Sequence, residues 1–124
     1  EIIIIVRAIC CIKPLHGILI VRLVDKYLEH ARAYWFQNDG ADELYLGSAD
    51  WMERNLYRRV EVVFPVYNPK LKKQIMACIK LQLEDNVKAT YIQIDSTNQR
   101  LPLGIPEIRA QVDFYEWLKK KVKA

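Results

Sequence analysis

The sequence lacks any cysteine pattern and any long apolar run. Its three cysteines, Cys10, Cys11 and Cys78, form no Cys-x-x-Cys pair and no regular spacing with histidine. They support neither a disulfide framework nor a zinc site, and we interpret them as small apolar residues in a reducing compartment. The apolar run at the N-terminus, Ile2–Val6, stops at Arg7, far short of the ~20 residues that span a bilayer. We therefore expect no membrane segment and no targeting signal.

Repeats, low-complexity segments and a strong excess of one charge are absent as well. The chain of 124 residues, 52% apolar and 27% charged, has the size and composition of one folded domain, which argues against disorder. Its net charge of +4 favours anionic partners but identifies no specific nucleic acid. We expect residues 1–124 to form a single domain of a cytoplasmic protein, free or attached peripherally to a membrane. Because the chain starts inside a strand without an initiator Met, we also expect a fragment of a longer protein.

Apolar periodicity predicts alternating strands and helices in the order β-α-β-β-β-α-β-α. The predicted elements are a strand at Ile2–Val6, a helix at Ile18–Leu28, a hairpin of Ala33–Phe36 and Glu43–Leu46, a strand at Arg59–Val66, a helix from Pro69 to Leu83 capped by Asn68, a strand at Val87–Ile94, a polar loop at Ser96–Ile105, and a helix from Pro106 with the apolar stripe Ile108, Val112, Tyr115 and Leu118. This alternation indicates an α/β fold, with a mixed sheet flanked by helices.

His30, in the segment YLEHARAYWF, is the first candidate for chemistry. A lone histidine beside an apolar run is more often structural than catalytic, so a functional interpretation needs support from other residues. That support is GSAD, residues 47–50, which follows the second strand of the predicted hairpin. Histidine can attack phosphorus, a nearby cation stabilises charged oxygens, and a hydroxyl orients the ring or the phosphate. The two segments together point to phosphoryl chemistry.

This arrangement resembles the signature of the phospholipase-D-like superfamily, which has HxK, then an Asp, then GSxN at the end of a hairpin. The matching positions are His30, Arg32 in place of the Lys, Gln37 in place of the Asp, and Gly47, Ser48 and Asp50 in place of GSxN. The histidine, a cation and the serine are kept. Without the Lys, Asp and Asn, the segment departs from a complete hydrolytic site.

Longer strings make the resemblance specific. The segments VRAICCIKP, VDKYLEHARAYWF, YLGSADWMERNLYRRVEVVFPV, DNVKATYI and RAQVDFYEWLK are similar to the C-terminal catalytic domain of polyphosphate kinases, over nearly the whole chain. The resemblance implies a phospholipase-D-like fold and a phosphotransferase that reversibly moves the terminal phosphate of ATP onto polyphosphate. It also implies ATP/ADP and Mg²⁺ as cofactors of the full-length enzyme. A preceding catalytic domain of the same chain would carry the phosphorylated histidine.

The resemblance further implies roles for single residues. His30 matches the second histidine of the family, which faces the nucleotide phosphates, and it is expected to transfer a proton or to position phosphate. Arg7 matches an arginine that contacts ATP phosphate, in agreement with its place at the end of a strand, where α/β sheets expose ligand-binding groups. Ser48 either orients His30, binds phosphate or caps the strand end. The residues left open between a site role and a structural role are Asp50, Arg54, Arg58 and Arg59.

A dedicated metal site is not expected, because no carboxylate cluster has ligand spacing, so Mg²⁺ would be held by phosphates and by the preceding domain. The family's glycine-rich loop is missing between Pro14 and Leu15. Either the loop is lost or its residues lie outside this sequence, and we favour the second interpretation. Two other functions stay open: a phosphodiesterase or nuclease that uses His30 in a homodimer, and a non-catalytic polyanion-binding module. We expect the fragment alone to be inactive as a kinase, and we leave a homo-oligomer open.

Overall fold

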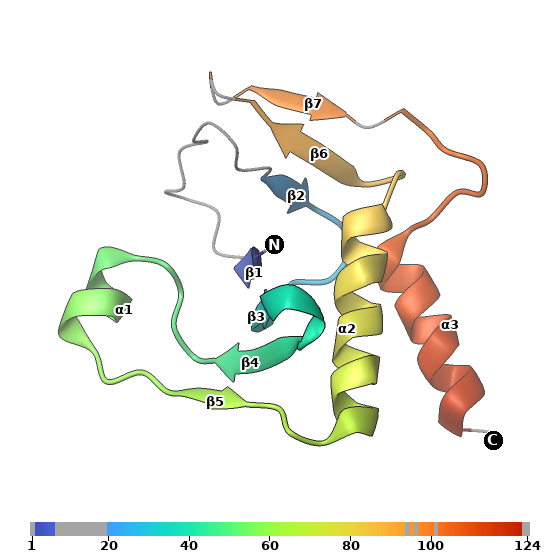
Figure 1. The fold of residues 1–124 in the computed structure, drawn as a ribbon. Helices are drawn as coiled ribbons and strands as arrows, with labels where there is room; N and C mark the ends of the chain where they lie inside the picture. Colours follow the sequence, from blue (N-terminus) through green and yellow to red (C-terminus); the bar gives the residue numbers. More distant parts are fainter. Residues whose placement is uncertain (1, 7–19, 94, 96, 101, 123–124) are drawn as a thin grey trace. The chain divides into compact units, whose positions relative to one another are not determined.

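The computed structural model describes residues 2–6, 20–93, 95, 97–100 and 102–122, with the backbone alone described for residues 2–6 (Figure 1). By their internal contacts the residues divide into unit 1, Glu1–Ile12 with Glu29–Ile75, and unit 2, Lys13–Leu28 with Met76–Ala124. The elements are β1 (Ile2–Val6), β2 (Val21–Leu23), β3 (Arg32–Phe36), the 3₁₀ turn η1 (Asn38–Gly40), β4 (Glu43–Gly47), α1 (Glu53–Arg58), β5 (Val63–Pro65), α2 (Pro69–Glu84), β6 (Ala89–Ile92), β7 (Asn98–Arg100) and α3 (Ala110–Val122). The predicted α/β class is confirmed.

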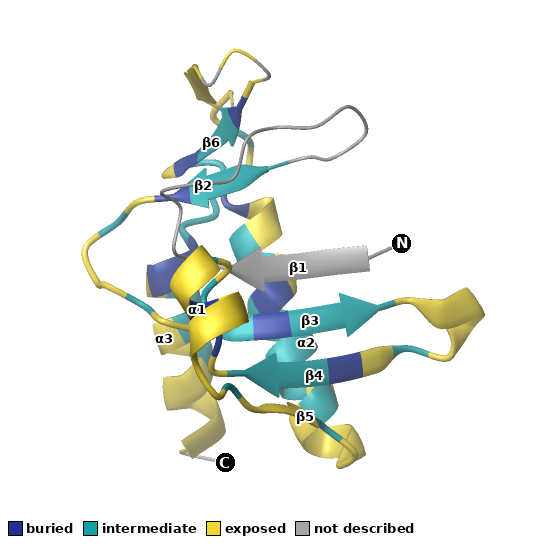
Figure 2. Cartoon of the chain, turned by 90° about the vertical axis from the view of Figure 1, so that its left-hand side faces the viewer, coloured by how far each residue is buried: buried dark blue, intermediate teal, exposed yellow. Residues whose placement is uncertain are grey.

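Unit 1 contains a four-stranded sheet in the order β1-β3-β4-β5, and each neighbouring pair is antiparallel. The predicted hairpin is confirmed as β3 and β4, with Phe36 opposite Glu43 beside the turn and Ala33 opposite Leu46 at the other end. The turn residues Asn38, Asp39 and Gly40 all have positive φ, a conformation that these three residue types adopt most easily. Figure 2 shows a buried residue near the start of β3 and of β4, which are Ala33 and Leu44, whereas α1 is exposed except at Asn55.

Unit 2 contains a three-stranded antiparallel sheet in the order β2-β6-β7 (Figure 1). Its buried cluster consists of Leu23, Ala89 and Ala110, with Val21 against it. The strands described in the two units therefore form two small antiparallel sheets, where the alternation had favoured one mixed sheet. The expectation of a single domain stays a prediction. No helix in the described part of the chain is long and apolar enough to cross a membrane.

The carboxylate of Asp85 organises the chain between α2 and α3. The residue is 0% exposed. Its Oδ1 accepts hydrogen bonds from the amides of Val87, Lys88 and Ala89 at 3.0, 2.6 and 3.1 Å, and its Oδ2 accepts one from the amide of Ala110 at 2.8 Å. One side chain thus satisfies amides at the start of β6 and the first amide of α3, which would otherwise lack acceptors.

The predicted helix at Ile18–Leu28 is wrong for its described part. Val21–Leu23 is strand β2, and beyond it the backbone amide and carbonyl of Tyr27 bind the side-chain amide of Gln111 at 2.9 and 2.7 Å. Asp25, whose side chain is 2% exposed, binds Arg109. These tertiary contacts hold the segment in a non-helical conformation with a bend at Lys26 and Tyr27, and they override the helical spacing of the apolar residues.

The predicted apolar stripe of the last helix is also wrong. Val112, Tyr115 and Leu118 are 46%, 58% and 40% exposed. Helix α3 begins at Ala110 rather than at Pro106, and its buried residues are Ala110 and Gln111. Because Gln111 must reach Tyr27, the helix is turned about its axis so that a polar side chain is covered and part of the apolar stripe is not.

The predictions around α1 and α2 have mixed outcomes. The predicted strand at Arg59–Val66 is confirmed only as Val63–Pro65, and helix α1 before it was not predicted. Part of the predicted loop at Ser96–Ile105 is strand β7. Asn68 caps α2 as expected, because its Oδ1 accepts hydrogen bonds from the amides of Lys70 and Leu71 at 2.9 and 3.2 Å.

Candidate functional site

The antiparallel pairing of β3 with β4 brings the two candidate segments to one end of the sheet in unit 1. Ala33 at the start of β3 lies opposite Leu46 near the end of β4. His30 precedes β3 and Ser48 follows β4, so the register places the histidine segment and GSAD beside each other, although 18 positions separate Arg32 from Asp50. Strand β1 ends at the same edge, since Val6 pairs with Arg32.

Arg32 connects these segments directly. Its Nε donates to Oδ1 of Asp50 at 2.7 Å, and its Nη1 donates to the backbone carbonyl of His30 at 3.2 Å. The side chains of Arg32 and Asp50 are 19% and 18% exposed, so the pair is only partly screened by water. The hydrogen bond from Arg32 lowers the pKa of the Asp50 carboxyl, with smaller contributions from the charges of Arg32, His30 and Arg54. Asp50 therefore stays ionised and holds the arginine in place.

Ser48 takes part in a second network with Glu61 and Asn55. Its hydroxyl bonds the carboxylate of Glu61 and accepts the amide of Val62 at 3.0 Å, while Nδ2 of Asn55 donates to Glu61 at 2.9 Å. Asn55 is 4% exposed, and its Oδ1 has no hydrogen-bond partner among the described residues. The network joins the end of β4, helix α1 and the segment before β5.

Gly47 allows an aromatic ring to cross the end of β4. A Cβ at this position would lie 3.0 Å from Cε2 of Tyr34 and 3.3 Å from Cγ2 of Val63, closer than ordinary contact. The glycine of GSAD therefore has a steric role, because it leaves room for the ring above the strand.

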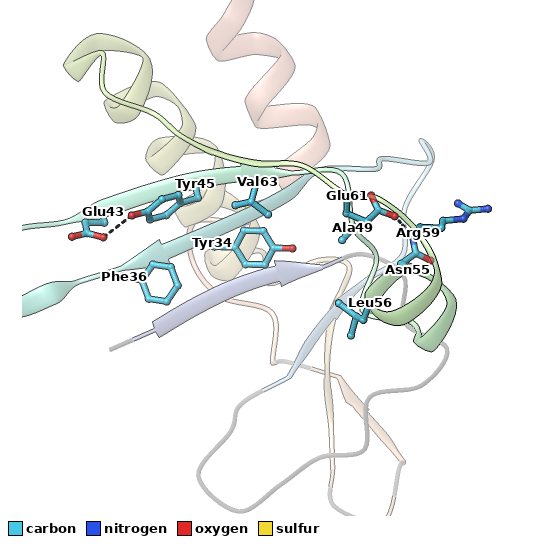
Figure 3. Close-up of a pocket in the computed structure, with 10 residues that line it drawn as sticks. All are labelled: Tyr34, Phe36, Glu43, Tyr45, Ala49, Asn55, Leu56, Arg59, Glu61 and Val63. Carbon is cyan, nitrogen blue, oxygen red and sulfur yellow. Dashed lines mark hydrogen bonds between the residues drawn. The ribbon is translucent and has the colours of Figure 1, made fainter.

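A hollow of about 730 Å³ lies on this face of the sheet (Figure 3). The described residues that line it are Tyr34, Phe36, Glu43, Tyr45, Ala49, Asn55, Leu56, Arg59, Glu61 and Val63. Figure 3 shows the aromatic rings along the strands, with Asn55 and Arg59 at the α1 end. The lining of this hollow thus combines aromatic rings with carboxylate, amide and guanidinium groups.

The predicted site residues are only partly brought together. His30 is exposed beside the Arg32–Asp50 pair. The hydroxyl of Ser48 is hydrogen-bonded to the carboxylate of Glu61 and to the amide of Val62. This arrangement agrees with strand-end capping, one of the roles that the sequence left open. Arg7 lies outside the described residues. The assigned roles of these residues in catalysis and phosphate binding stay predictions.

The residues left open fall into separate groups. Asp50 is a partner of Arg32. Arg58 lies 3.8 Å from Glu53 in a highly exposed pair, and such pairs contribute little. Arg59 lines the hollow.

Glu61 and Asn55 were missed by the sequence reasoning. Glu61 interrupts an apolar run in RRVEVVF and Asn55 follows an arginine in MERN, so neither position stands out in the sequence. Within the described part of the chain, no group of three or more His, Cys, Asp or Glu side chains could hold a metal ion.

Comparison with known proteins identifies the relatives of this chain. Residues 1–111 match the family described as polyphosphate kinase C-terminal domain 2. The chain belongs to the polyphosphate kinase family. It is 42% identical over 124 residues to polyphosphate kinase 1 of Chlorobaculum tepidum, covering 96% of this chain and 18% of that protein. It is 41% identical over 120 residues to the polyphosphate kinase of Escherichia coli K12, covering 92% of this chain and 17% of that protein.

A solved structure supports the same family and fold. The crystal structure of the polyphosphate kinase from Porphyromonas gingivalis matches with a TM-score of 0.86 and 43% identity, over 94% of this chain and 19% of that one. The resemblance to polyphosphate kinases and the phospholipase-D-like fold class are thus confirmed. The chain spans less than a fifth of the length of each of these three relatives, at 18%, 17% and 19%.

Proposed function

We propose that this chain is part of the catalytic core of a polyphosphate kinase, a phosphotransferase that reversibly moves the terminal phosphate of ATP onto polyphosphate. The phosphate would pass through a phosphohistidine in the preceding domain of the same protein. The family membership supports this proposal, as does the meeting of the His30 segment with GSAD at one end of the sheet. The full-length enzyme would work in the cytoplasm.

His30 is the proposed assisting residue. An exposed imidazole can give a proton to the oxygen of a departing nucleotide, or donate a hydrogen bond to a phosphate oxygen in transit. The hydrogen bond from Arg32 to its carbonyl fixes the backbone of His30 relative to Asp50. Positioning of this kind matters because phosphoryl transfer depends mainly on alignment and charge stabilisation.

Arg7 and Ser48 are the proposed phosphate contacts. A guanidinium can bind two phosphate oxygens at once, which suits Arg7 to gripping ATP. Ser48 would act through its hydroxyl, either on phosphate or by keeping the strand end in shape.

ATP/ADP and Mg²⁺ are the proposed cofactors. Mg²⁺ prefers phosphate and carboxylate oxygens. In the described part of the chain, the carboxylate of Asp50 is already hydrogen-bonded to Arg32. The carboxylate of Glu61 is already hydrogen-bonded to Ser48 and Asn55. We therefore assign Mg²⁺ to the nucleotide phosphates and to groups of the preceding domain.

The observation that carries the proposal is the shared sheet end of His30 and GSAD, and the full-length protein tests it. Incubation with terminally labelled ATP and Mg²⁺ should yield an acid-labile phosphoenzyme and growing polyphosphate. His30→Gln should lower the rate of polyphosphate synthesis by about 100-fold or more, the scale of a lost general acid. Asp39→Asn, in the turn at the opposite end of the hairpin, is the matched control and should keep the wild-type rate.

One result would overturn the kinase proposal, and another would overturn the role of His30. A wild-type protein that forms neither product but cleaves a phosphodiester would be a phosphodiesterase. A His30→Gln variant with the wild-type rate would remove His30 from the reaction.

A further inference from the structure

The sheet of unit 2 has a row of basic side chains on one face. Arg22 of β2 lies opposite Thr90 of β6, and Thr90 lies opposite Arg100 of β7. Because side chains alternate along strands and directly opposed residues point the same way, these three share a face. Lys88, two positions before Thr90, shares this face as well.

A hollow of about 350 Å³ lies on this face. The described residues that line it are Arg22, Val24, Val87, Lys88, Thr90, Asn98 and Arg100. We call this set the three-cation face. It contains three cations and no carboxylate among its lining residues, so its electrostatic potential is positive.

The cations of this face are largely available for a ligand. Nη1 of Arg22 donates to Oδ1 of Asn98 at 3.2 Å, which fixes the direction of one guanidinium and leaves its other donors. Within the described residues, the side chains of Lys88 and Arg100 form no hydrogen bond or ion pair, and Lys88 acts only through its charge, which contributes to the lowered pKa of Asp25. Both residues are exposed.

The shape and chemistry of the face select the kind of anion. Neighbouring strands lie about 4.8 Å apart, so the rows that carry Arg22 and Arg100 are separated by about 10 Å. A chain of repeating phosphates can meet charges spaced in this way at several points at once. The lining residues include no aromatic side chain on which a nucleic-acid base could stack.

We propose that the three-cation face binds a stretch of the polyphosphate chain. It is a binding surface of unit 2, built from other residues than the sheet end that carries His30. The identification of the anion as polyphosphate rests on the proposed function. The face holds the polymer through charge alone, so it should favour long chains over short ones by multivalency.

The test uses the full-length protein and polyphosphates of two lengths. Arg22→Gln/Arg100→Gln should raise both the Kd and the KM for long-chain polyphosphate by about five- to tenfold, since each solvent-accessible charge contact contributes modestly. It should leave kcat and the KM for ATP within about twofold. The control Lys73→Gln/Lys120→Gln removes two exposed lysines from α2 and α3, and should bind like the wild type.

Further variants separate charge from structure. Arg22→Lys/Arg100→Lys keeps both positive charges and should restore most of the affinity for long chains. If the double glutamine variant does not fold, Lys88→Gln replaces it, because the exposed Lys88 side chain makes no hydrogen bond within the described residues. Lys88→Gln should raise the Kd by about twofold to threefold and weaken its dependence on salt.

The outcomes separate this proposal from the proposed function. If the wild type is active and the variants bind and use long polyphosphate normally, polyphosphate binding by the three-cation face is refuted and the kinase proposal still holds. If the wild type makes no polyphosphate but its binding of polyphosphate still depends on these cations, binding by the three-cation face is supported and the kinase proposal is refuted. An equal loss of affinity in the control variant would show non-specific charge attraction and refute the face.

Discussion

Replacement of Asp85 should separate the work of its two carboxylate oxygens. Oδ1 accepts the amides of Val87, Lys88 and Ala89, whereas Oδ2 accepts only the amide of Ala110, the first residue of α3. In Asp85→Asn, one oxygen becomes an NH₂ group. Because three amides face Oδ1, the remaining oxygen should stay there and leave the buried amide of Ala110 facing another donor.

The loss of folding free energy in each variant follows from the number of backbone amides left without an acceptor. A buried donor without an acceptor costs about 1–3 kcal/mol, so Asp85→Asn should weaken the start of α3 by about 2 kcal/mol. Asp85→Ala removes all four acceptor contacts, including those to the buried residues Ala89 and Ala110, and should cost about 4–5 kcal/mol.

Hydrogen exchange of single amides in the full-length protein measures this effect. In Asp85→Asn, the amide of Ala110 should exchange about 30-fold faster, which corresponds to about 2 kcal/mol, and the amides of Val87, Lys88 and Ala89 should change by less than about threefold. In Asp85→Ala, all four should accelerate. Equal acceleration of all four amides in Asp85→Asn would refute the division between the two oxygens.

Three further predictions concern both units. Gly47→Ala should lower the melting temperature of the full-length protein, at a cost of about 1–2 kcal/mol, because the new Cβ meets the ring of Tyr34 at 3.0 Å. Ser48→Ala should cost about 1 kcal/mol in a denaturant titration, because it removes the acceptor of a backbone amide. Acid should remove the contribution of the Asp25–Arg109 pair to the free energy of unfolding. The hydrogen bond from Arg109 lowers the pKa of Asp25 below its ordinary 3.8. The stabilisation by the pair is therefore present above about pH 4 and is lost as the pH falls through the lowered pKa. Melting curves of the wild type and Arg109→Gln should converge in that range.

Controls sharpen each of the three. Tyr34→Ser should relieve the effect of Gly47→Ala, and additive costs in the double variant would disprove the clash. Ser48→Thr keeps the hydroxyl and should melt like the wild type. If Arg109→Gln lost as much stability at pH 2 as at pH 7, titration of the partner carboxylate would not explain the acid sensitivity.

Local signals in the sequence predicted the hairpin and the cap of α2. The residues at the turn, Asn38 to Gly40, are ones that tolerate positive φ, and the runs on either side of them pair as expected. Asn68 before Pro69 gave the start of α2. Both features depend on neighbours in the sequence, which is why they could be predicted.

The elements that failed depend on distant partners. The segment at Asp25–Tyr27 is not helical because Arg109 and Gln111, 84 positions away, hold it in place. Their apolar neighbours have helical spacing, so periodicity alone favours the wrong structure. Strand β7, with all three of its residues exposed, has no apolar alternation to reveal it.

The residues of the candidate site likewise fall into those that the sequence predicts and those that only the fold reveals. His30, Ser48 and Asp50 were found because they lie in short motifs. Asn55 and Glu61 matter only through bonds that the folded chain creates, and no spacing rule connects them to Ser48. The motif thus gave the residues, and the structure gave the groups that hold them.

The two ends of the β3–β4 hairpin differ in their exposure to solvent. At the turn, every residue from Gln37 to Ala41 is exposed, whereas the open end carries the Arg32–Asp50 pair. A fluorophore attached to the exposed side chain of Asp39 would leave the length of the turn, and with it the strand register, unchanged. The turn therefore offers an attachment point for a reporter group on unit 1, away from the end of the sheet that carries His30.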